Sequence, residues 1–258
     1  MSKRLAVLMA LMLLPVAVPA LEDQGLYLHV IPVDVLERED DQDATLRLFI
    51  DNPEAVAATL TAKGMAVVAS DTDSLTVSLK NARQTFSGQP DDWLSDTFVI
   101  DYSEPSVVDM LASDAWQNDA QPLPIEAMED GVFDWISDKT YARNFDFAST
   151  VARTRSGDCT EHAVLLAAAA RASGKPARVV LGLMLVDGES PFVYGHAWTE
   201  VWADGEWQLL DATKPEAYAD AEALYYIPTG LLENESPSYA MSLFSLTLTF
   251  PARVELSR

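Results

Sequence analysis

The sequence predicts an α+β protein with a small N-terminal α/β module and a larger domain that carries the chemistry. Short segments rich in valine and isoleucine alternate with turn residues in the first third of the chain. Farther along, the alanine-rich run 163–172 has the composition of a helix. Two apolar runs then flank Asp204-Gly205, a dipeptide typical of tight hairpin turns. Helices and hairpin strands in one domain indicate the α+β class.

The composition bounds the kind of protein and the surfaces that it can bind. The chain has 258 residues, of which 49% are hydrophobic, and a formal net charge of −23. This is enough apolar material for one large domain or two small ones. So acidic a surface repels nucleic-acid phosphates and anionic lipid head groups. We therefore expect no nucleic-acid partner and a preference for neutral or cationic substrates.

The first twenty residues have the pattern of a secretory signal peptide. Lys3 and Arg4 precede the apolar run 5–18, and Val18-Pro19-Ala20 supplies small residues at the cleavage position. The apolar run is too short to span a bilayer comfortably. We predict that residues 1–20 are removed and that the mature protein is periplasmic or secreted, without a stable membrane anchor.

Residues 21–100 are predicted to form the small α/β module. The predicted strands cover 26–33, 44–50, 65–69 and 75–79, and the predicted helix begins at Pro53 and ends before Gly64. Residues 87–92 are interpreted as a loop or linker. The acidic runs 37–43 and 71–73 lack the glycine and closing glutamate of a calcium loop, so solvated turns are the better interpretation. The module shows no chemical motif.

Residues 101–258 are predicted to form the second domain, with its chemical motifs at about 133–213. A strand is expected at 97–102, at the boundary. The other elements that we expect are helices at 105–116, 125–139 and 163–172, a weaker candidate segment at 145–153, and strands at 177–186, 194–202, 206–211 and 242–250.

The only cysteine, Cys159, stands at the head of the alanine-rich helix. An exported protein with one cysteine cannot form an internal disulfide, so this thiol is either a small buried hydrophobe or a reactive group. A helix N-terminus favours a thiolate. Gly157 allows close backbone approach there, and the Cys159 backbone N–H is a natural oxyanion donor.

Three histidines compete for the role of base. His29 lies in the first module without a clear companion, and His162 lies about one helical turn after Cys159. His196 lies among small residues on a predicted strand, with Trp198 on the same face. We favour His196, although a lone strand histidine is more often structural. A metal site from Cys159, His162 and His196 is weak because other ligands are few, so no metal or cofactor is expected.

Asp211 ends the second strand of the predicted hairpin. Its carboxylate could hold the second nitrogen of the His196 imidazole and fix the ring tautomer. It could equally cap the turn at Ala212-Thr213. This segment alone leaves both interpretations open.

Four ordered motifs resemble the transglutaminase-like superfamily, whose thiol-enzyme core is shared with papain-like enzymes. They are Gly157-Asp158-Cys159, the run from Arg171 through Gly174 and Pro176 to Val180, His196-Ala197-Trp198-Thr199-Glu200-Val201, and Trp207 through Leu210-Asp211-Ala212-Thr213. Ala212 stands where many members have proline. The resemblance covers about 133–213.

The resemblance implies a catalytic triad of Cys159, His196 and Asp211 on an α+β core in which the cysteine helix packs on an antiparallel sheet. It also implies a second oxyanion donor upstream of the cysteine, which we seek in 141–147. The expected activity is attack on an amide through a Cys159 thioester, of the peptidase or amidase type, on a peptide or protein such as cell-wall peptide. A cross-linking acyltransferase and a non-catalytic binding or scaffold protein that keeps the fold are the alternatives.

Overall fold

The structure is a computed structural model, and it describes most of the chain beyond the first 29 residues. The described residues are 30–38, 43–62, 64–80, 85–114, 116, 123–139, 146–214, 221, 223–232 and 250–258. The predicted signal peptide, residues 1–20, and His29 lie outside them. No helix within these ranges is long and apolar enough to cross a membrane.

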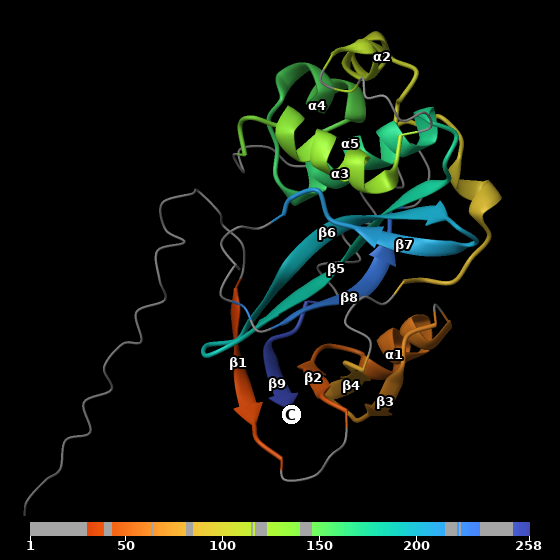
Figure 1. The fold of residues 1–258 in the computed structure, drawn as a ribbon. Helices are drawn as coiled ribbons and strands as arrows, with labels where there is room; N and C mark the ends of the chain where they lie inside the picture. Colours follow the sequence, from red (N-terminus) through yellow and green to blue (C-terminus); the bar gives the residue numbers. More distant parts are fainter. Residues whose placement is uncertain are drawn as a thin grey trace, which may run out of the picture.

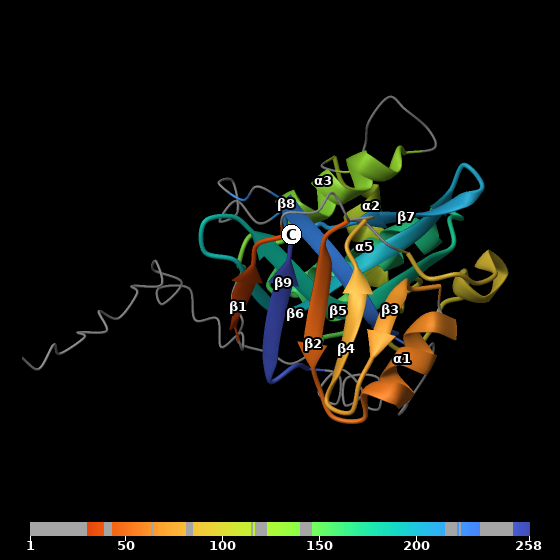
Figure 2. The ribbon, with the colours of Figure 1, turned by 90° about the horizontal axis from the view of Figure 1, so that it is seen from below.

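The first module is a twisted sheet flanked by one helix. Its elements are β1 (Ile31–Leu36), β2 (Thr45–Phe49), α1 (Pro53–Ala62), β3 (Val67–Ser70) and β4 (Ser74–Ser78). Figure 2 shows β2, β4 and β3 side by side with α1 against the outer strands. The helix begins at Pro53, whose missing N–H costs nothing in a first turn, as expected from the sequence.

A helical layer and the motif-bearing strands follow. The helices are η1 (Pro90–Trp93, a 3₁₀ turn), α2 (Pro105–Ala112), α3 (Ile125–Trp135), α4 (Ala148–Thr154) and α5 (Cys159–Ala172). The strands are β5 (Ala177–Asp187), β6 (Phe192–Ala203), β7 (Glu206–Leu210) and β8 (Ala223–Leu231). The predicted β6–β7 hairpin is present, and Asp204 and Gly205 both have positive φ, as its tight turn requires.

The strands form one hydrogen-bonded path, β3-β4-β2-β9-β1-β6-β5-β8, with β7 added beside β6. All pairs are antiparallel except β1 with β9. The C-terminal strand β9 (Arg253–Ser257) lies between β1 and β2, inside the first module. The division predicted at residue 100 is therefore incomplete, because the end of the chain returns to the module at its start. Figure 1 shows this arrangement.

Two apolar cores lie on the two faces of the strands β5 and β6. Helices α2 to α5 cover one face, where Val179, Leu181 and Ala197 pack on the alanine side of α5. Val180, Met184 and Trp198 point to the other face and join the core of the first module. Both faces of β5 are thus covered, which explains why the strand is buried throughout.

A buried ion pair fastens the linker between the two parts. Arg178 and Glu200 are register partners on β5 and β6, and Arg178 Nη2 lies 2.6 Å from Glu200 Oε2. Glu200 also accepts the N–H of Phe86 at 3.2 Å, and the Trp207 indole donates to the Gly88 carbonyl at 3.1 Å. The motif residues Arg178, Glu200 and Trp207 therefore bind the linker segment and are not bonded to the thiol of Cys159. Losing one partner of such a pair leaves a buried charge and costs roughly 3–5 kcal/mol.

Three sequence expectations differ from the structure. Residues 97–102 form a turn instead of a strand: the Thr97 N–H donates to the Ile100 carbonyl at 3.2 Å, and Val99 and Ile100 are buried against the helical layer. Strand β8 was not expected. The first strand begins at Ile31 and runs to Leu36, later than predicted. Residues 242–249 of the predicted last strand lie outside the described residues, as do 26–29 of the first.

Candidate functional site

Helix α5 begins at Cys159 because the residues around it form a capping box. The Asp158 carboxylate accepts the backbone N–H of Thr160 at 2.9 Å, and the Glu161 carboxylate accepts the N–H of Asp158 at 2.9 Å. Two N–H groups that a helix start leaves unpaired are thereby satisfied. The cap fixes Cys159 as the first helical residue, and the Cys159 N–H makes no hydrogen bond to another described group.

The buried Glu161 joins the cysteine helix to the segment before α4. Its Oε1 accepts the Asp146 N–H at 2.9 Å, while Oε2 accepts the Asp158 N–H. A Cβ on Gly157 would lie 2.2 Å from Glu161 Cβ, so only glycine leaves room for this side chain. Burial, followed by the charge of Asp158, raises the pKa of Glu161 to about 7. The Asp-x-x-Glu pattern of the capping box could have revealed Glu161, which the sequence analysis did not single out.

Cys159 is buried, with 8% of the residue exposed, and its thiol is free of any disulfide. Burial raises its pKa well above the ordinary value, and the carboxylates of Asp158, Asp211 and Glu161 add to this. A hydrogen bond from the Ala197 N–H acts in the opposite direction but is outweighed. The expectation that the helix start favours a thiolate is therefore not met in the resting site, because burial, together with the surrounding carboxylates, outweighs that effect. A protonated thiol is the resting form at neutral pH.

His196 lies on β6, directly before the residue whose N–H contacts the thiol. Its Nε2 donates to Asp211 Oδ2 at 2.8 Å, which assigns the proton to Nε2. Its Nδ1 is buried and makes no hydrogen bond to any described group, Cys159 included. With Nε2 bound to Asp211, Nδ1 is the ring nitrogen that has no bound partner among these residues.

Asp211 follows β7 and is almost fully buried. Its Oδ1 accepts the Thr213 N–H at 3.1 Å and the Thr213 hydroxyl at 2.5 Å, so it caps the turn as well as holding the ring. Burial works to raise its pKa, but the His196 charge and the hydrogen bonds from His196, Thr213 and Tyr226 prevail and hold it well below its usual range. Asp211 remains a carboxylate.

Aromatic rings enclose the His196 imidazole. Trp198 stacks on it with ring centroids 6.2 Å apart, on the shared strand face expected from the sequence. The Trp198 ring lies over Gly182, where a Cβ would come within 2.6 Å of it. Tyr226 of β8 also reaches this face, and its hydroxyl donates to Asp211 Oδ2 at 2.8 Å. No sequence signal pointed to Tyr226, because its strand was not predicted.

His162, the rival base, lies on α5 and is buried. Its Nδ1 donates to the Asp158 carbonyl at 2.6 Å, four residues earlier on the helix. Burial lowers its pKa to about 4, against smaller opposing effects that include the Asp158 carbonyl and Asp211. No described carboxylate holds its ring. Most of 141–147, where a second oxyanion donor was sought, lies outside the described residues.

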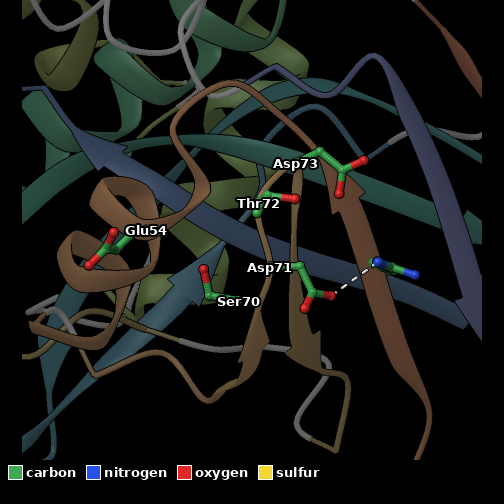
Figure 3. A pocket seen from close by; sticks show the side chains of 6 residues that line it. Glu54, Ser70, Asp71, Thr72 and Asp73 are labelled. Atoms are coloured by element: carbon green, nitrogen blue, oxygen red, sulfur yellow. Dashed lines mark hydrogen bonds and ion pairs between the residues drawn. The ribbon is translucent and has the colours of Figure 1, made fainter.

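A concavity on the first module includes none of these residues. Figure 3 shows it beside α1 and the β3–β4 turn. It measures about 820 Å³, and its lining residues are Arg47, Glu54, Ser70, Asp71, Thr72 and Asp73. Arg47 pairs with Asp71 at 3.1 Å. Within the described parts of the chain, no three histidine, cysteine, aspartate or glutamate side chains are grouped to hold a metal ion.

Comparisons with known proteins find one matching family model and several similar solved structures. Residues 112–212 match the family model described as the transglutaminase-like superfamily. A structure of a candidate cysteine protease from Cytophaga hutchinsonii is similar, with 16% identity, a TM-score of 0.48, and coverage of 78% of this chain and 79% of that one. The periplasmic domain of TgpA from Pseudomonas aeruginosa, bound to ethylmercury, has 23% identity, a TM-score of 0.37, and coverage of 58% and 60%. A comparison with curated protein sequences finds no match.

Proposed function

Residues 112–212 of this chain belong to the transglutaminase-like superfamily, and from this premise we propose that the protein is a thiol enzyme that acts on amide bonds through a thioester on Cys159. The proposed roles are nucleophile for Cys159, base for His196 and orienting carboxylate for Asp211. The observation that supports this proposal best is the 2.8 Å bond from His196 Nε2 to Asp211 Oδ2, which leaves Nδ1 as a buried acceptor beside the strand residue that contacts the thiol.

The chemistry begins from a neutral thiol and a neutral imidazole. As the sulfur attacks the substrate carbonyl, the S–H proton passes to His196 Nδ1, and the Asp211 carboxylate stabilises the imidazolium. The Cys159 N–H, at the N-terminal end of α5, is the proposed donor to the oxyanion. The C–N bond then breaks, and the amine leaves with the proton from His196.

The acyl group is released by a second attack. Water, deprotonated by His196, adds to the thioester carbonyl, and the sulfur leaves and regains a proton. We propose that water is the acceptor, which makes the protein a peptidase or amidase acting on a peptide or protein substrate such as cell-wall peptide. A lysine amine in place of water would make it a cross-linking acyltransferase with the same three residues.

The proposed location is the periplasm or the extracellular medium. The support is the pattern of residues 1–20, with two cations, an apolar run and small residues before the cleavage position. The lone cysteine fits this location, because it has no partner with which to be oxidised internally. Mass spectrometry of the protein recovered from the producing cell would identify the mature N-terminus; retention of residues 1–20 would contradict the proposal.

The function is tested by following acylation of the mature protein with p-nitrophenyl acetate in a single turnover. We expect p-nitrophenolate release and an acetyl group that mass spectrometry locates on Cys159. His196→Ala should slow acylation by about 10²–10⁴-fold, the range for loss of a positioned base. Cys159→Ala is the control for reaction elsewhere. Equal acylation of wild type and His196→Ala would contradict the assigned base. Added lysine amide distinguishes the acceptors by forming an acetylated amine.

One observation favours a non-catalytic binding role instead. The thiol is nearly closed off from solvent, and His196 Nδ1 is not hydrogen bonded to it. A buried thiol with no proton acceptor in contact is also what a retained but inactive fold would contain. In the producing cell, Cys159→Ala separates the two: the same phenotype as deletion supports an enzyme, whereas a wild-type phenotype beside a deletion defect supports binding.

A further inference from the structure

We infer that Tyr226 is a positioning residue of the reaction centre, which orients the Asp211 carboxylate and limits how strongly that carboxylate attracts the His196 proton. The inference rests on the proposed function, since it assigns a fourth residue to the same thiol site. Tyr226 would not touch the substrate. It would act through Asp211 on the ring of His196.

The hydrogen bonds of Asp211 support this role. Oδ2 accepts two donors at the same distance, His196 Nε2 at 2.8 Å and the Tyr226 hydroxyl at 2.8 Å. Oδ1 accepts two from Thr213, and the Asp211 N–H donates to Glu129 Oε1 of α3 at 2.6 Å. Each carboxylate oxygen therefore has two donors, which fills its two lone-pair directions. The carboxylate has no freedom to rotate without breaking one of these bonds.

The sheet carries Tyr226 across the site from a distant strand. Tyr226 and Tyr194 both pair with Met184 of β5, on opposite sides, so the tyrosine starts two strands away from β6. Gly182, which pairs with His196, has no side chain to obstruct the space, and Trp198 fills it. The Tyr226 ring packs edge-on against Trp198 with centroids 5.2 Å apart, and it is only 3% exposed. A packed ring in this position gives its hydroxyl a fixed direction.

A second donor on Oδ2 has a chemical consequence. A hydrogen bond to a carboxylate stabilises the anion and makes it a weaker proton acceptor. With Tyr226 in place, the shared proton stays on His196 Nε2, and Nδ1 stays available for the thiol proton. The same bond withdraws charge from Asp211, so the imidazolium is stabilised less than it would be by an undivided carboxylate. Tyr226 thereby favours the neutral thiol–imidazole pair at rest.

A merely structural tyrosine would show different behaviour. Buried tyrosines usually find a hydrogen-bond partner, and Asp211 could serve only that purpose. Removing the Tyr226 hydroxyl would then lower the stability of the fold. The titration of His196 and the rate of Cys159 acylation in the folded protein would stay the same. The decisive measurements are therefore the tautomer and titration of the His196 ring, together with acylation under conditions where the variants are folded.

The variant is Tyr226→Phe, which keeps the ring and its packing on Trp198, and the matched control is Tyr225→Phe on the same strand. Nitrogen-15 NMR of histidine-labelled full-length protein reports the ring tautomer, with His196 assigned from the His196→Ala spectrum. We expect Tyr226→Phe to raise the titration midpoint of His196, because the Asp211 carboxylate is no longer shared. We expect it to slow single-turnover acylation of Cys159 by p-nitrophenyl acetate about tenfold, because the loss of a bond that orients the carboxylate outweighs the stronger stabilisation of the imidazolium; the size is that expected for one bond to a charged group.

Tyr225→Phe is expected to change neither quantity, because the donors to the Asp211 carboxylate are His196, Thr213 and Tyr226 rather than Tyr225. If Tyr226→Phe matches Tyr225→Phe in both midpoint and acylation rate, Tyr226 has no positioning role. If wild type and His196→Ala acylate equally, the proposed function itself fails. If His196→Ala is slow while Tyr226→Phe matches wild type, only the present inference fails.

Discussion

The two buried histidines His162 and His196 differ in what holds their rings. His196, on a strand, donates Nε2 to a carboxylate, whereas His162, on the helix, donates Nδ1 to a backbone carbonyl. A carboxylate stabilises a positively charged ring, and a single carbonyl in a buried site does not offset the loss of water. The helix histidine therefore stays neutral down to a pKa of about 4. The partner of its second nitrogen, rather than distance from the thiol along the sequence, is therefore the reason for proposing His196 as the base.

The change with the largest expected effect removes the negative charge of Asp211, the carboxylate that binds the His196 ring. Asp211→Asn keeps the shape but offers His196 Nε2 an amide, which allows the ring to adopt the other tautomer. In a triad, a change of this kind costs about 10⁴-fold in turnover. We expect a loss of about 10³–10⁴-fold in single-turnover acylation of Cys159. His162→Asn, which keeps a donor toward the Asp158 carbonyl, should retain most of the rate. The reverse order of losses would make His162 the base.

The second test concerns the pH dependence of stability that His162 contributes. Its folded pKa of about 4 lies below the ordinary value of 6.5, so its contribution is fully present above pH 6.5 and is lost as pH falls toward 4. The shift corresponds to on the order of 3 kcal/mol. We expect urea unfolding to show wild type losing stability relative to His162→Asn as pH falls through this window. A constant difference between the two would show that the ring does not titrate as its burial indicates.

The third test uses the neighbouring carboxyl, whose shift has the opposite sign. Glu161 has a folded pKa of about 7, above the ordinary 4.5, so its ionisation destabilises the fold as pH rises from 4.5 through 7. The effect on the free energy of unfolding is on the order of 3 kcal/mol, since the pKa shift of Glu161 is similar in size to that of His162. We expect wild type to lose stability relative to Glu161→Gln as pH rises.

Between pH 4.5 and 6.5 these two contributions oppose each other, so the wild-type stability should vary less with pH than that of either variant. Urea unfolding of wild type and both variants at several pH values measures this directly. If both variants track wild type across the window, the two side chains carry no linked protons.

The smallest expected effect comes from the glycine that precedes the cap. Gly157→Ala would place a Cβ within 2.2 Å of Glu161 Cβ, so the capping box or the 157–158 backbone must move. Crowding of this kind costs about 1–3 kcal/mol. Thermal unfolding measures the loss, and Gly174→Ala serves as the comparison, because no atom lies within 4 Å of the added Cβ although its φ of +77° adds backbone strain. Equal stability of Gly157→Ala and wild type would mean that Glu161 is not held against Gly157.

Local chemistry made several elements predictable. The Pro53 start of α1, the helix that follows Cys159 and the Asp204-Gly205 hairpin each depend on neighbouring residues. The prediction of a strand at 97–102 was wrong, because an apolar segment can be buried in a turn as well as in a sheet. Strand β8 and the return of β9 beside β1 depend on pairing between distant segments, for which the sequence offers no local sign.

The sequence by itself determined the candidate chemistry: one cysteine at a helix start, the order Cys159, His196, Asp211, and four motifs typical of one superfamily. Only the tertiary structure decided the electrostatics around them. Burial and three carboxylates keep the thiol protonated, and Tyr226 reaches Asp211 from a strand that no motif marks. Residue types and short spacings are local properties, whereas a pKa depends on burial and on every charge that the fold brings near.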